Sequence, residues 1–279
     1  MPAQKSPHFF ASEHGAAPDR VPRTLEDYLA LFEPARGDQL LGEASPSYLR
    51  SHTAASRIAA LQPQARIIAI LREPASFLRS LHLQLLQNHV EAEKDFAKAI
   101  ALEQDRREGR RIPRGCPWPQ ALFYSDHVRY VEQLRRYQAV FAPENVLVLI
   151  YDEFRADNEG TVRSVLRFLD VDDAVPVEVR DANPTVRLRS RRLDDLIHRA
   201  TVGQGPVMKG VKVGVKAVTS RRLRHGVLGR RSSVVYGEPV EPDEQMMLAL
   251  RRRFRGEVVA LSEYLRRDLV TLWAYDDLD

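Results

Sequence analysis

An arginine and a serine eight residues apart are the pair in this sequence whose types and spacing best suit chemistry. Arg72 directly follows a short apolar run at 67–71, and Ser80 follows the turn at Pro74 inside a stretch with helical spacing. The pattern predicts a buried parallel strand, a turn and a helix. Ligands of open α/β sheets bind beyond the carboxyl ends of the strands. A guanidinium fork and a short hydroxyl at that edge suit a phosphate monoester.

A plainer interpretation makes Arg72 a surface ion-pair residue and Ser80 an ordinary helix serine, and spacing alone leaves both open. However, the Arg-Glu-Pro-x5-Ser run after an apolar strand resembles the 3′-phosphate-binding motif of sulfotransferases, which use 3′-phosphoadenosine-5′-phosphosulfate (PAPS). Glu73 and Phe77 stand where that motif often has Asp and a basic residue. The resemblance implies that Arg72 and Ser80 bind the nucleotide 3′-phosphate.

A carboxylate earlier in the chain is a candidate for the same crevice. Glu43 follows Leu40 and Leu41, which we predict to form a short strand, and precedes a turn at Pro46. A partly desolvated carboxylate has a raised pKa and can take the proton of a sugar hydroxyl. The segment resembles Glu-Lys-Thr-Pro-x-Tyr of carbohydrate sulfotransferases, which implies that Glu43 is a general base. A helix N-cap or a surface ion pair is the alternative.

The first residues carry another part of the resemblance. Lys5-Ser6-Pro7-His8-Phe9-Phe10 is similar to a Lys-Glu-Pro-His-Phe/Tyr-Phe segment of bacterial and heparan-type sulfotransferases, and implies that Lys5 offsets charge on the sulfuryl group. In the family a strand and a Gly-rich loop that cradles the 5′-phosphosulfate precede this segment. The only Gly-rich candidate here, at 203–210, follows no apolar strand and contains Pro206. We therefore expect the first strand and phosphate loop to be missing from this sequence. Either the natural start lies upstream of Met1, which the family-like residues after Met1 favour, or the protein lacks half of its cofactor site.

Three further residues are candidates for contact with the acceptor. Trp118 lies in a Pro- and Arg-rich loop, where it would stack on a sugar face or anchor the loop. Tyr124 and His127 resemble the pair in the family's Gly-x-Tyr-x-x-His-Leu, which implies that they line the cleft. Without that resemblance, His127 is a partly buried helix histidine. No His, Cys or Asp cluster suggests a metal, so we expect none.

Apolar spacing predicts the elements that position these residues. We expect an α/β fold like that of P-loop NTPases, a parallel sheet with helices on both faces, in a single domain over 1–279. Its last part is a helical region at 241–273 with a core-facing apolar stripe. The predicted strands are 66–71 and 146–151, and the predicted helices are 24–32, 53–61, 76–89, 91–108 (highly charged and so exposed), 120–141, 157–169, 190–199 and one that starts at Pro242.

Bulk properties narrow the class of protein. A chain of 279 residues can bury a large core. The formal charge of +4 is uneven, because nine Lys and Arg and no acidic residue lie between Asp195 and Glu238. This basic segment, at about 199–237, suits an anionic partner. A single cysteine, Cys116, and the lack of a membrane-length apolar run or signal-peptide h-region favour a cytoplasmic protein.

We therefore predict a sulfotransferase that moves a sulfuryl group from PAPS to a hydroxyl or amine of a carbohydrate or small molecule and releases PAP. A nucleotide or phosphate-ester kinase would share the fold but need a Walker-type Lys and Mg²⁺ ligands, which are not visible. A non-catalytic protein that binds nucleic acid or an acidic glycan through residues 199–231 is another alternative, with nucleic acid the less expected partner. The last alternative is a degenerate, inactive sulfotransferase.

Overall fold

The computed structural model describes most of the chain and divides it into two units. The first unit comprises residues 1–180 and 243–279, and the second comprises residues 181–242. The described residues are 6–14, 22–178, 187–188, 236–237 and 243–278.

In the second unit the description covers one short antiparallel pair. β3 (Arg187–Leu188) pairs with β4 (Tyr236–Gly237). The helix predicted at 190–199 lies outside the described residues, as does all of the basic segment at 199–237 except β4.

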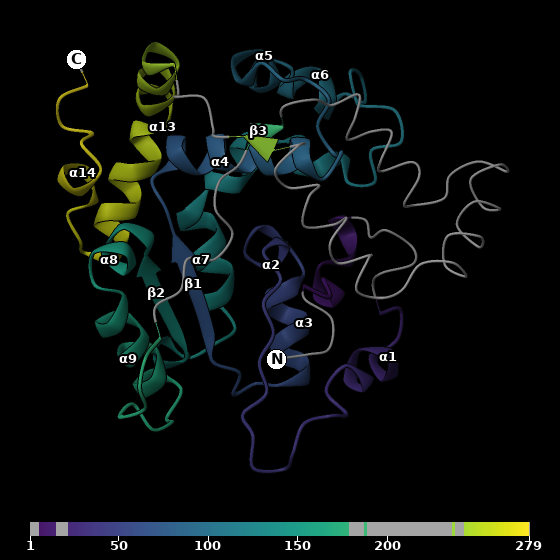
Figure 1. The fold of residues 1–279 in the computed structure, drawn as a ribbon, viewed down its shortest axis with the longest axis vertical. Coiled ribbons are helices and arrows are strands. Elements are labelled where there is room, and N and C mark those ends of the chain that lie inside the picture. The colour runs from purple at the N-terminus through teal and green to yellow at the C-terminus, as the bar shows by residue number, and fades with distance from the viewer. Residues whose placement is uncertain (1–5, 15–21, 179–186, 189–235, 238–242, 279) are drawn as a thin grey trace, which may run out of the picture. The chain divides into compact units, whose positions relative to one another are not determined.

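The sheet of the first unit is parallel. β1 (Ile67–Leu71) pairs with β2 (Val146–Ile150) in register from Ile67 opposite Val146 to Leu71 opposite Ile150 (Figure 1). Both strands are short apolar runs, as expected of a sheet covered by helices. The predicted α/β fold with a parallel sheet is confirmed, and both strands lie within one residue of the predicted bounds.

One face of β1 is buried more completely than the other. Alternate residues of a strand point to opposite faces. Ala69 and Leu71 lie in the main core, whereas Ile68 and Ile70 remain 40% and 49% exposed. The core therefore lies on the Ala69 side of the sheet.

Helices flank the strands. In Figure 1, α2 and α3 lie beside β1, α8 and α9 lie beside β2, and α4 lies above the carboxyl end of β1. The helical elements of the described residues are η1 (Phe9–His14), α1 (Leu25–Ala30), α2 (Ser47–Arg50), α3 (Ala54–Leu61), α4 (Pro74–Gln87), α5 (Phe96–Ala101), α6 (Glu103–Arg107), η2 (Pro119–Leu122), η3 (Tyr124–Val128), α7 (Tyr130–Gln138), η4 (Pro143–Asn145), α8 (Tyr151–Ala156), α9 (Asn158–Phe168), α13 (Glu244–Leu265) and α14 (Leu269–Leu272).

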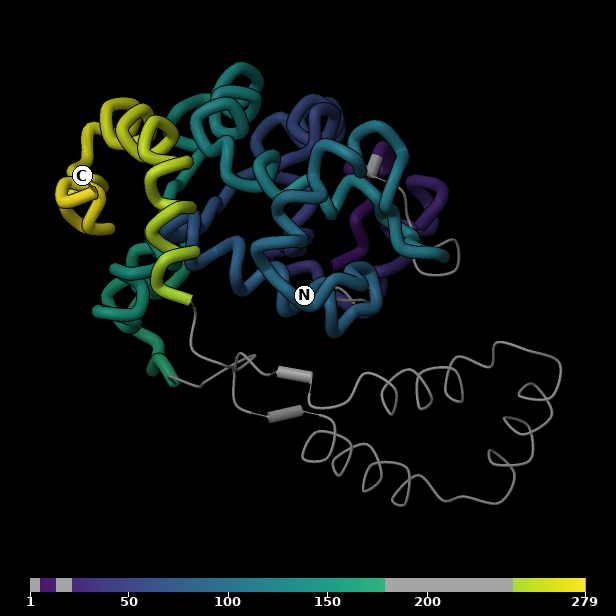
Figure 2. The backbone as a smooth tube through the Cα atoms, turned by 90° about the horizontal axis from the view of Figure 1, so that it is seen from above, coloured from purple at the N-terminus to yellow at the C-terminus, as the bar shows by residue number. Residues whose placement is uncertain are grey.

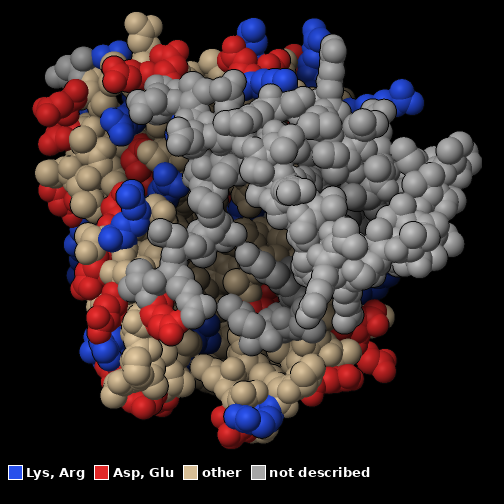
Figure 3. Space-filling model, viewed as in Figure 1, with Lys and Arg blue, Asp and Glu red and all other residues tan. Residues whose placement is uncertain are grey.

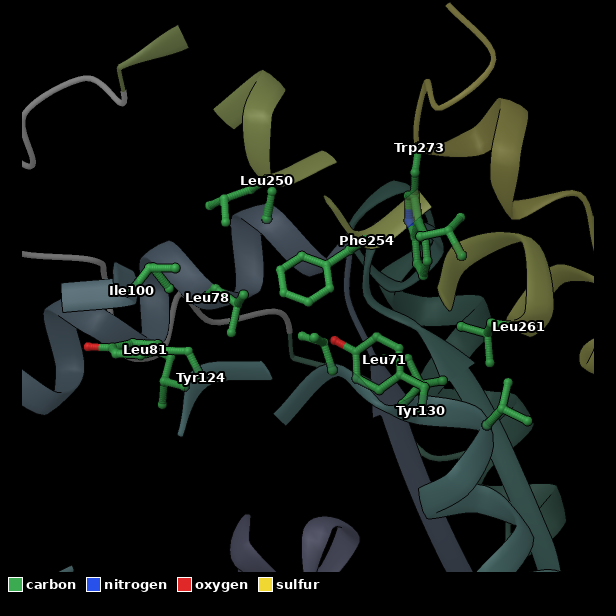
Figure 4. Close-up of a cluster of buried hydrophobic side chains, with 14 of the residues drawn as sticks. Leu71, Leu78, Leu81, Ile100, Tyr124, Tyr130, Leu250, Phe254, Leu261 and Trp273 are labelled. Atoms are coloured by element: carbon green, nitrogen blue, oxygen red, sulfur yellow. The ribbon is translucent and has the colours of Figure 1, made fainter. Parts of the chain in front are cut away.

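The long helix α13 completes the main core. Its buried residues Leu250, Phe254, Val258 and Leu261 recur at helical spacing and pack with the residues of β1, α4 and α7 that Figure 4 shows. The predicted core stripe of this region is thereby confirmed. In Figure 2, α13 and α14 lie at the opposite end of the first unit from α1. Within the described part of the chain, no helix has the length and hydropathy to cross a membrane.

The prediction of one exposed helix at 91–108 is wrong. The segment contains the two short helices α5 and α6, and Glu91 precedes both of them. Glu91 is fully buried and accepts 2.8 Å hydrogen bonds on both oxygens from the Arg106 guanidinium. A buried carboxylate needs such a partner. The pair therefore places in the interior two charged side chains that composition alone predicts to be exposed.

The helix predicted at 120–141 forms only in its second half. The 3₁₀ turns η2 and η3 precede α7, and the buried residues Leu122 and Val128 lie in those turns. These two residues are six positions apart, which does not match the repeat of an α-helix. The pattern therefore located buried residues correctly but gave the wrong local structure.

Candidate active site

Arg72 lies at the carboxyl end of β1, and both its backbone and its side chain are held in place. The Tyr130 hydroxyl donates a 2.9 Å hydrogen bond to the Arg72 carbonyl. The Arg72 guanidinium carbon lies 4.9 Å from the ring centroid of Tyr151, the first residue after β2. This is a cation–π contact, which orients the guanidinium without using its hydrogen-bond donors. Donors thus remain for an anion at the edge where both strands end.

Glu73 fixes the turn between β1 and α4. Its carboxylate accepts hydrogen bonds from the backbone N–H groups of Ala75 at 3.0 Å and Ser76 at 2.7 Å, so it is the N-cap of α4. The Tyr275 hydroxyl donates to its Oε1 at 2.5 Å, and Arg251 Nε lies 3.8 Å from the same oxygen. The Glu in place of the family's usual Asp is therefore a buried structural residue.

Ser80 lies in α4, away from the buried face of that helix. It is half-buried and lies one turn beyond Ser76, on the same side of α4. The buried face consists of Pro74, Ala75, Leu78, Leu81, His82 and Leu85. The predicted strand, turn and helix are confirmed here, while the joint binding of a phosphate by Arg72 and Ser80 stays a prediction.

The strand predicted before Glu43 does not form. Leu40 and Leu41 are 60% and 53% exposed and lie in irregular backbone. Side chains supply the hydrogen bonds that a neighbouring strand would otherwise provide. Ser6 Oγ donates to the Ala44 carbonyl at 2.9 Å. The apolar run before Gly42 has only two residues, Leu40 and Leu41. It is too short to distinguish a strand from a loop.

The Glu43 carboxylate is half-buried among hydroxyl groups. Ser45 Oγ donates to Oε2 at 2.8 Å. Burial raises the pKa of Glu43, and the hydroxyls of Tyr48, Ser45 and Tyr28 partly oppose that shift. Oε1 is buried and has no hydrogen-bond partner of good geometry among the described residues. The carboxylate therefore combines a raised pKa with an oxygen that can still accept a proton.

Tyr28 and Tyr48 remain protonated beside this carboxylate. Burial and the adjacent Glu43 charge raise the pKa of each phenol well above its usual value. Each phenol therefore keeps an O–H that can donate toward Glu43. Sequence analysis assigned neither a role, although Tyr48 belongs to the Pro-x-Tyr turn that marked Glu43.

His8 connects the Glu43 segment to Trp118. Its backbone N–H donates to Ser45 Oγ at 3.0 Å, and its Nδ1 lies 2.7 Å from Ser47 Oγ. The His8 and Trp118 ring centroids are 6.4 Å apart. The backbone φ of His8 is 55°, a left-handed conformation that non-glycine residues seldom adopt and that is common at functional sites. Glu43 and Trp118 thus share one chain of contacts, through a residue to which sequence analysis gave no role.

Tyr124 and His127 occupy different environments in η3. Tyr124 is fully buried, and its hydroxyl lies 2.9 Å from His82 Nδ1 and donates to Glu91 Oε2 at 3.0 Å. His127 is half-buried, with Nε2 3.1 Å from the Ala121 carbonyl oxygen. The structure gives Tyr124 an internal hydrogen-bonding role, and contact of either residue with an acceptor stays a prediction.

The predicted residues form two groups that η2 connects. Trp118, with His8 and Glu43, lies at the start of η2. His127 contacts the Ala121 carbonyl at the other end, and its ring centroid is 6.3 Å from that of Phe77, one turn before Ser80 in α4. Lys5 lies outside the described residues. The described residues include no group of three or more His, Cys, Asp or Glu side chains that could hold a metal ion.

Comparison with known proteins identifies the class of fold and then the family. The crystal structure of a sulfotransferase from Alicyclobacillus acidocaldarius matches with a TM-score of 0.66 and 21% sequence identity, over 98% of this chain and 87% of that chain. This likeness shows a sulfotransferase fold. The sequence profile described as the sulfotransferase family matches residues 3–174, more than half of the chain. The chain therefore belongs to the sulfotransferase family, as the Arg72 to Ser80 motif predicted.

Proposed function

We propose that this protein is a PAPS-dependent sulfotransferase that acts on a hydroxyl or amine of a carbohydrate or small molecule. The observation that carries the proposal is the β1–α4 turn. Arg72 ends a parallel strand directly before the buried cap of the helix that contains Ser80. Family membership and fold support sulfuryl transfer in general.

The chemistry of the β1–α4 turn fits the 3′-phosphate of PAPS. Guanidinium groups bind phosphate through paired N–H donors. The Tyr151 ring supports the Arg72 guanidinium from one side without using those donors, and Ser80 adds a hydroxyl from α4. PAPS supplies an activated sulfuryl group and leaves as PAP.

Glu43 is the proposed general base. It takes the proton of the acceptor hydroxyl or amine, whose oxygen or nitrogen then bonds to sulfur while the bond from sulfur to PAP breaks. Its raised pKa suits this role, because a carboxylate that binds its proton more tightly is a stronger base. The hydroxyls of Tyr28 and Tyr48 orient the carboxylate, and Lys5 would offset charge on the sulfuryl group. The rest of the catalysis consists of positioning the acceptor against the sulfuryl group and stabilising the charge that develops during transfer.

The acceptor is proposed to lie between Glu43, Trp118 and His127. Trp118 offers an aromatic face, which suits a sugar ring. On the face that Figure 3 shows, the Lys and Arg of the described residues are interspersed with Asp and Glu, without a large field of one sign. The alternative of a basic binding protein depends on residues 199–231, which lie outside the described residues.

Calorimetric titration with PAP tests the function. We expect Arg72→Ala to weaken PAP binding by about 1.5–3 kcal/mol, the usual worth of a hydrogen bond to a charged group. Arg66→Ala is the matched control, because Arg66 precedes the other end of β1 and donates to the Phe168 carbonyl at 2.6 Å. It should leave PAP affinity unchanged.

The titration should include a form extended to the nearest upstream in-frame start, because the family's phosphate loop precedes the segment that resembles residues 5–10. Unchanged affinity of Arg72→Ala would remove Arg72 from the site. Absence of PAP binding by both forms of the wild-type chain would overturn the proposed function.

A further inference from the structure

A cleft of about 360 Å³, lined mostly by charged residues, lies beside α2 and η2. Neither the sequence motifs nor the family resemblance assigned it a role. Four arginines, three carboxylates and Gln120 are among the residues that line it. The distribution of ion pairs among these charges shows what the cleft can still bind.

The three carboxylates of the cleft already have partners. Asp126 accepts two hydrogen bonds from Arg107, at 2.7 and 3.1 Å. Glu132 accepts one from Arg136 at 2.8 Å. Glu13 accepts from the backbone N–H of His52 at 3.0 Å, among other donors. These acids therefore bind protein donors and neutralise much of the basic lining.

Arg50 differs from the other arginines of the cleft. It is half-buried, and its Nη1 donates a 3.3 Å hydrogen bond to the Gln120 carbonyl. No carboxylate of the described residues lies within 4 Å of its guanidinium, whereas Arg107, Arg129 and Arg136 each have an ion pair. Burial lowers the pKa of Arg50 to about 10, and the charges of Asp126 and Glu13 only partly oppose this. Arg50 is thus a charged, partly desolvated guanidinium with donors to spare.

The Gln120 side chain adds a polar atom that has no partner among the described residues. Its Oε1 is buried and has no hydrogen-bond partner among the described residues. The oxygen and nitrogen of a side-chain amide exchange places by a half-turn, so Gln120 can present its NH₂ group instead. Arg50 and Gln120 together then offer several N–H donors to one small anion.

The cleft is adjacent to the proposed acceptor site. Ser47 and Arg50 lie one turn apart on α2, about 4.5 Å along the helix axis. Ser47 contacts His8 of the Glu43 group, and Arg50 contacts Gln120. The residue two positions before Gln120 is Trp118. An acceptor bound at Glu43 and Trp118 could therefore place a substituent in the cleft.

We propose that this cleft binds a carboxylate of the acceptor, with Arg50 as the specificity-determining residue. The assignment rests on the proposed sulfotransferase function and narrows the acceptor to a uronic acid or a saccharide that contains one. A carboxylate matches the planar guanidinium fork. The three carboxylates that line the cleft would repel a phosphate dianion more strongly than a carboxylate monoanion. Trp118 provides the aromatic face for the sugar ring that bears the carboxylate.

Calorimetry with a matched pair of glycosides tests this proposal. p-Nitrophenyl β-glucuronide and p-nitrophenyl β-glucoside differ only at C6, which is a carboxylate in the first and a hydroxymethyl group in the second. The wild-type chain should bind the glucuronide about tenfold more tightly, the lower range for a charged hydrogen bond. Arg50→Gln should bind both alike, with the affinity for the glucoside unchanged.

Two variants serve as controls. Arg129→Gln removes the same charge from the same cleft, but from an arginine that has a partner, and should keep the preference for the glucuronide. Arg50→Lys keeps the charge without the planar fork and should retain only part of the preference. Equal affinity of the wild-type chain for the two glycosides, or no binding of either, overturns the proposal, as does a preference that persists in Arg50→Gln.

Titration of the same samples with PAP separates this proposal from the proposed function. A wild-type chain that binds PAP without preferring the glucuronide overturns only the assignment of the cleft. A preference for the glucuronide, with no PAP binding by either the chain or its extended form, keeps the anion-binding cleft and overturns the sulfotransferase function. PAP binding by Arg50→Gln also shows that this variant is folded.

Discussion

The two halves of the candidate site are built in different ways. The β1–α4 turn that contains Arg72 joins a regular strand to a capped helix, and the main core supports both. Glu43 lies on irregular backbone that hydrogen bonds to side chains hold in place. The half proposed to bind the nucleotide thus rests on elements that the whole fold stabilises. The half proposed to take the proton rests on a few side-chain hydrogen bonds to the segment at residues 6–8.

This difference predicts that the two halves respond separately to substitution. Changes near Glu43 should alter turnover and its pH dependence while PAP affinity stays constant. Changes near Arg72 should alter PAP affinity, and those that reach the buried cap should also alter stability. A substitution in one half that affected both properties equally would contradict the separation.

The largest expected effect is that of Glu43→Gln. Removal of a general base lowers turnover by about 10²–10⁴-fold, while the affinity for PAP should not change. Transfer of radiolabelled sulfate from PAPS, with calorimetry on the same samples, measures both quantities. Wild-type turnover in this variant would eliminate Glu43 as the base.

Tyr275→Phe should lower the free energy of unfolding. The variant loses the hydrogen bond from the Tyr275 hydroxyl to Glu73, which corresponds to about 1.5–3 kcal/mol for a charged acceptor. Urea denaturation measures the change. Tyr264→Phe is the control, because the Tyr264 hydroxyl bonds to Gln138 at an exposed site and should contribute little. Equal free energies of unfolding for the two variants would show that the hydrogen bond to Glu73 stabilises the fold no more than an exposed one does.

Ser45→Ala should shift the pH dependence of turnover. The Ser45 hydroxyl stabilises the charged form of Glu43 and lowers its pKa against the effect of burial. Without it the pKa rises further, so the acid limb of the rate profile should move to higher pH. Ser47→Ala is the control, since Ser47 contacts His8 instead. An unshifted profile would contradict the proposed link between Ser45 and the base.

The raised pKa of Glu43 also predicts how the stability of the fold changes with pH. The folded protein holds the Glu43 proton more tightly than the unfolded chain. The contribution of Glu43 to stability should therefore decrease as pH rises from the ordinary glutamate pKa through the raised one. In Glu43→Gln this dependence should be absent, which urea denaturation at several pH values can measure.

The smallest expected effect is that of Tyr151→Leu. Loss of the cation–π contact with Arg72 should weaken PAP binding by about 0.5–1 kcal/mol, the lower range for such contacts. Turnover at saturating PAPS should not change, because Tyr151 is not proposed to contact the reacting atoms. A large drop in saturated turnover would assign Tyr151 to the chemistry and break the separation of the two halves.

The sequence predicted the Arg72 half well because its pattern is strong. An unbroken apolar run, then a proline and helical spacing, permits few structures other than a strand, a turn and a helix. The core stripe of α13 was predictable for the same reason. The bond that completes the Glu73 cap was not predictable, because its donor Tyr275 is 202 positions away in the sequence.

The Glu43 half was only partly predictable. The motif indicated the carboxylate, but the strand predicted before it does not form. Burial raises the pKa of this carboxylate, and the hydroxyls that oppose this shift include that of Tyr28, which lies outside the motif. The buried pair of Glu91 and Arg106 eluded prediction similarly, because charged residues look exposed until their partner is known.

The hydrogen bond between Tyr275 and Glu73 also has a consequence for biosynthesis. A ribosome releases the chain from its N-terminus onward, so β1, α4 and β2 emerge long before residue 275. A nascent chain can therefore pair its strands, but it cannot complete the turn beside Arg72 until residue 275 has emerged. Chains cut before residue 275 by early termination or proteolysis would keep the sheet and lack the finished turn.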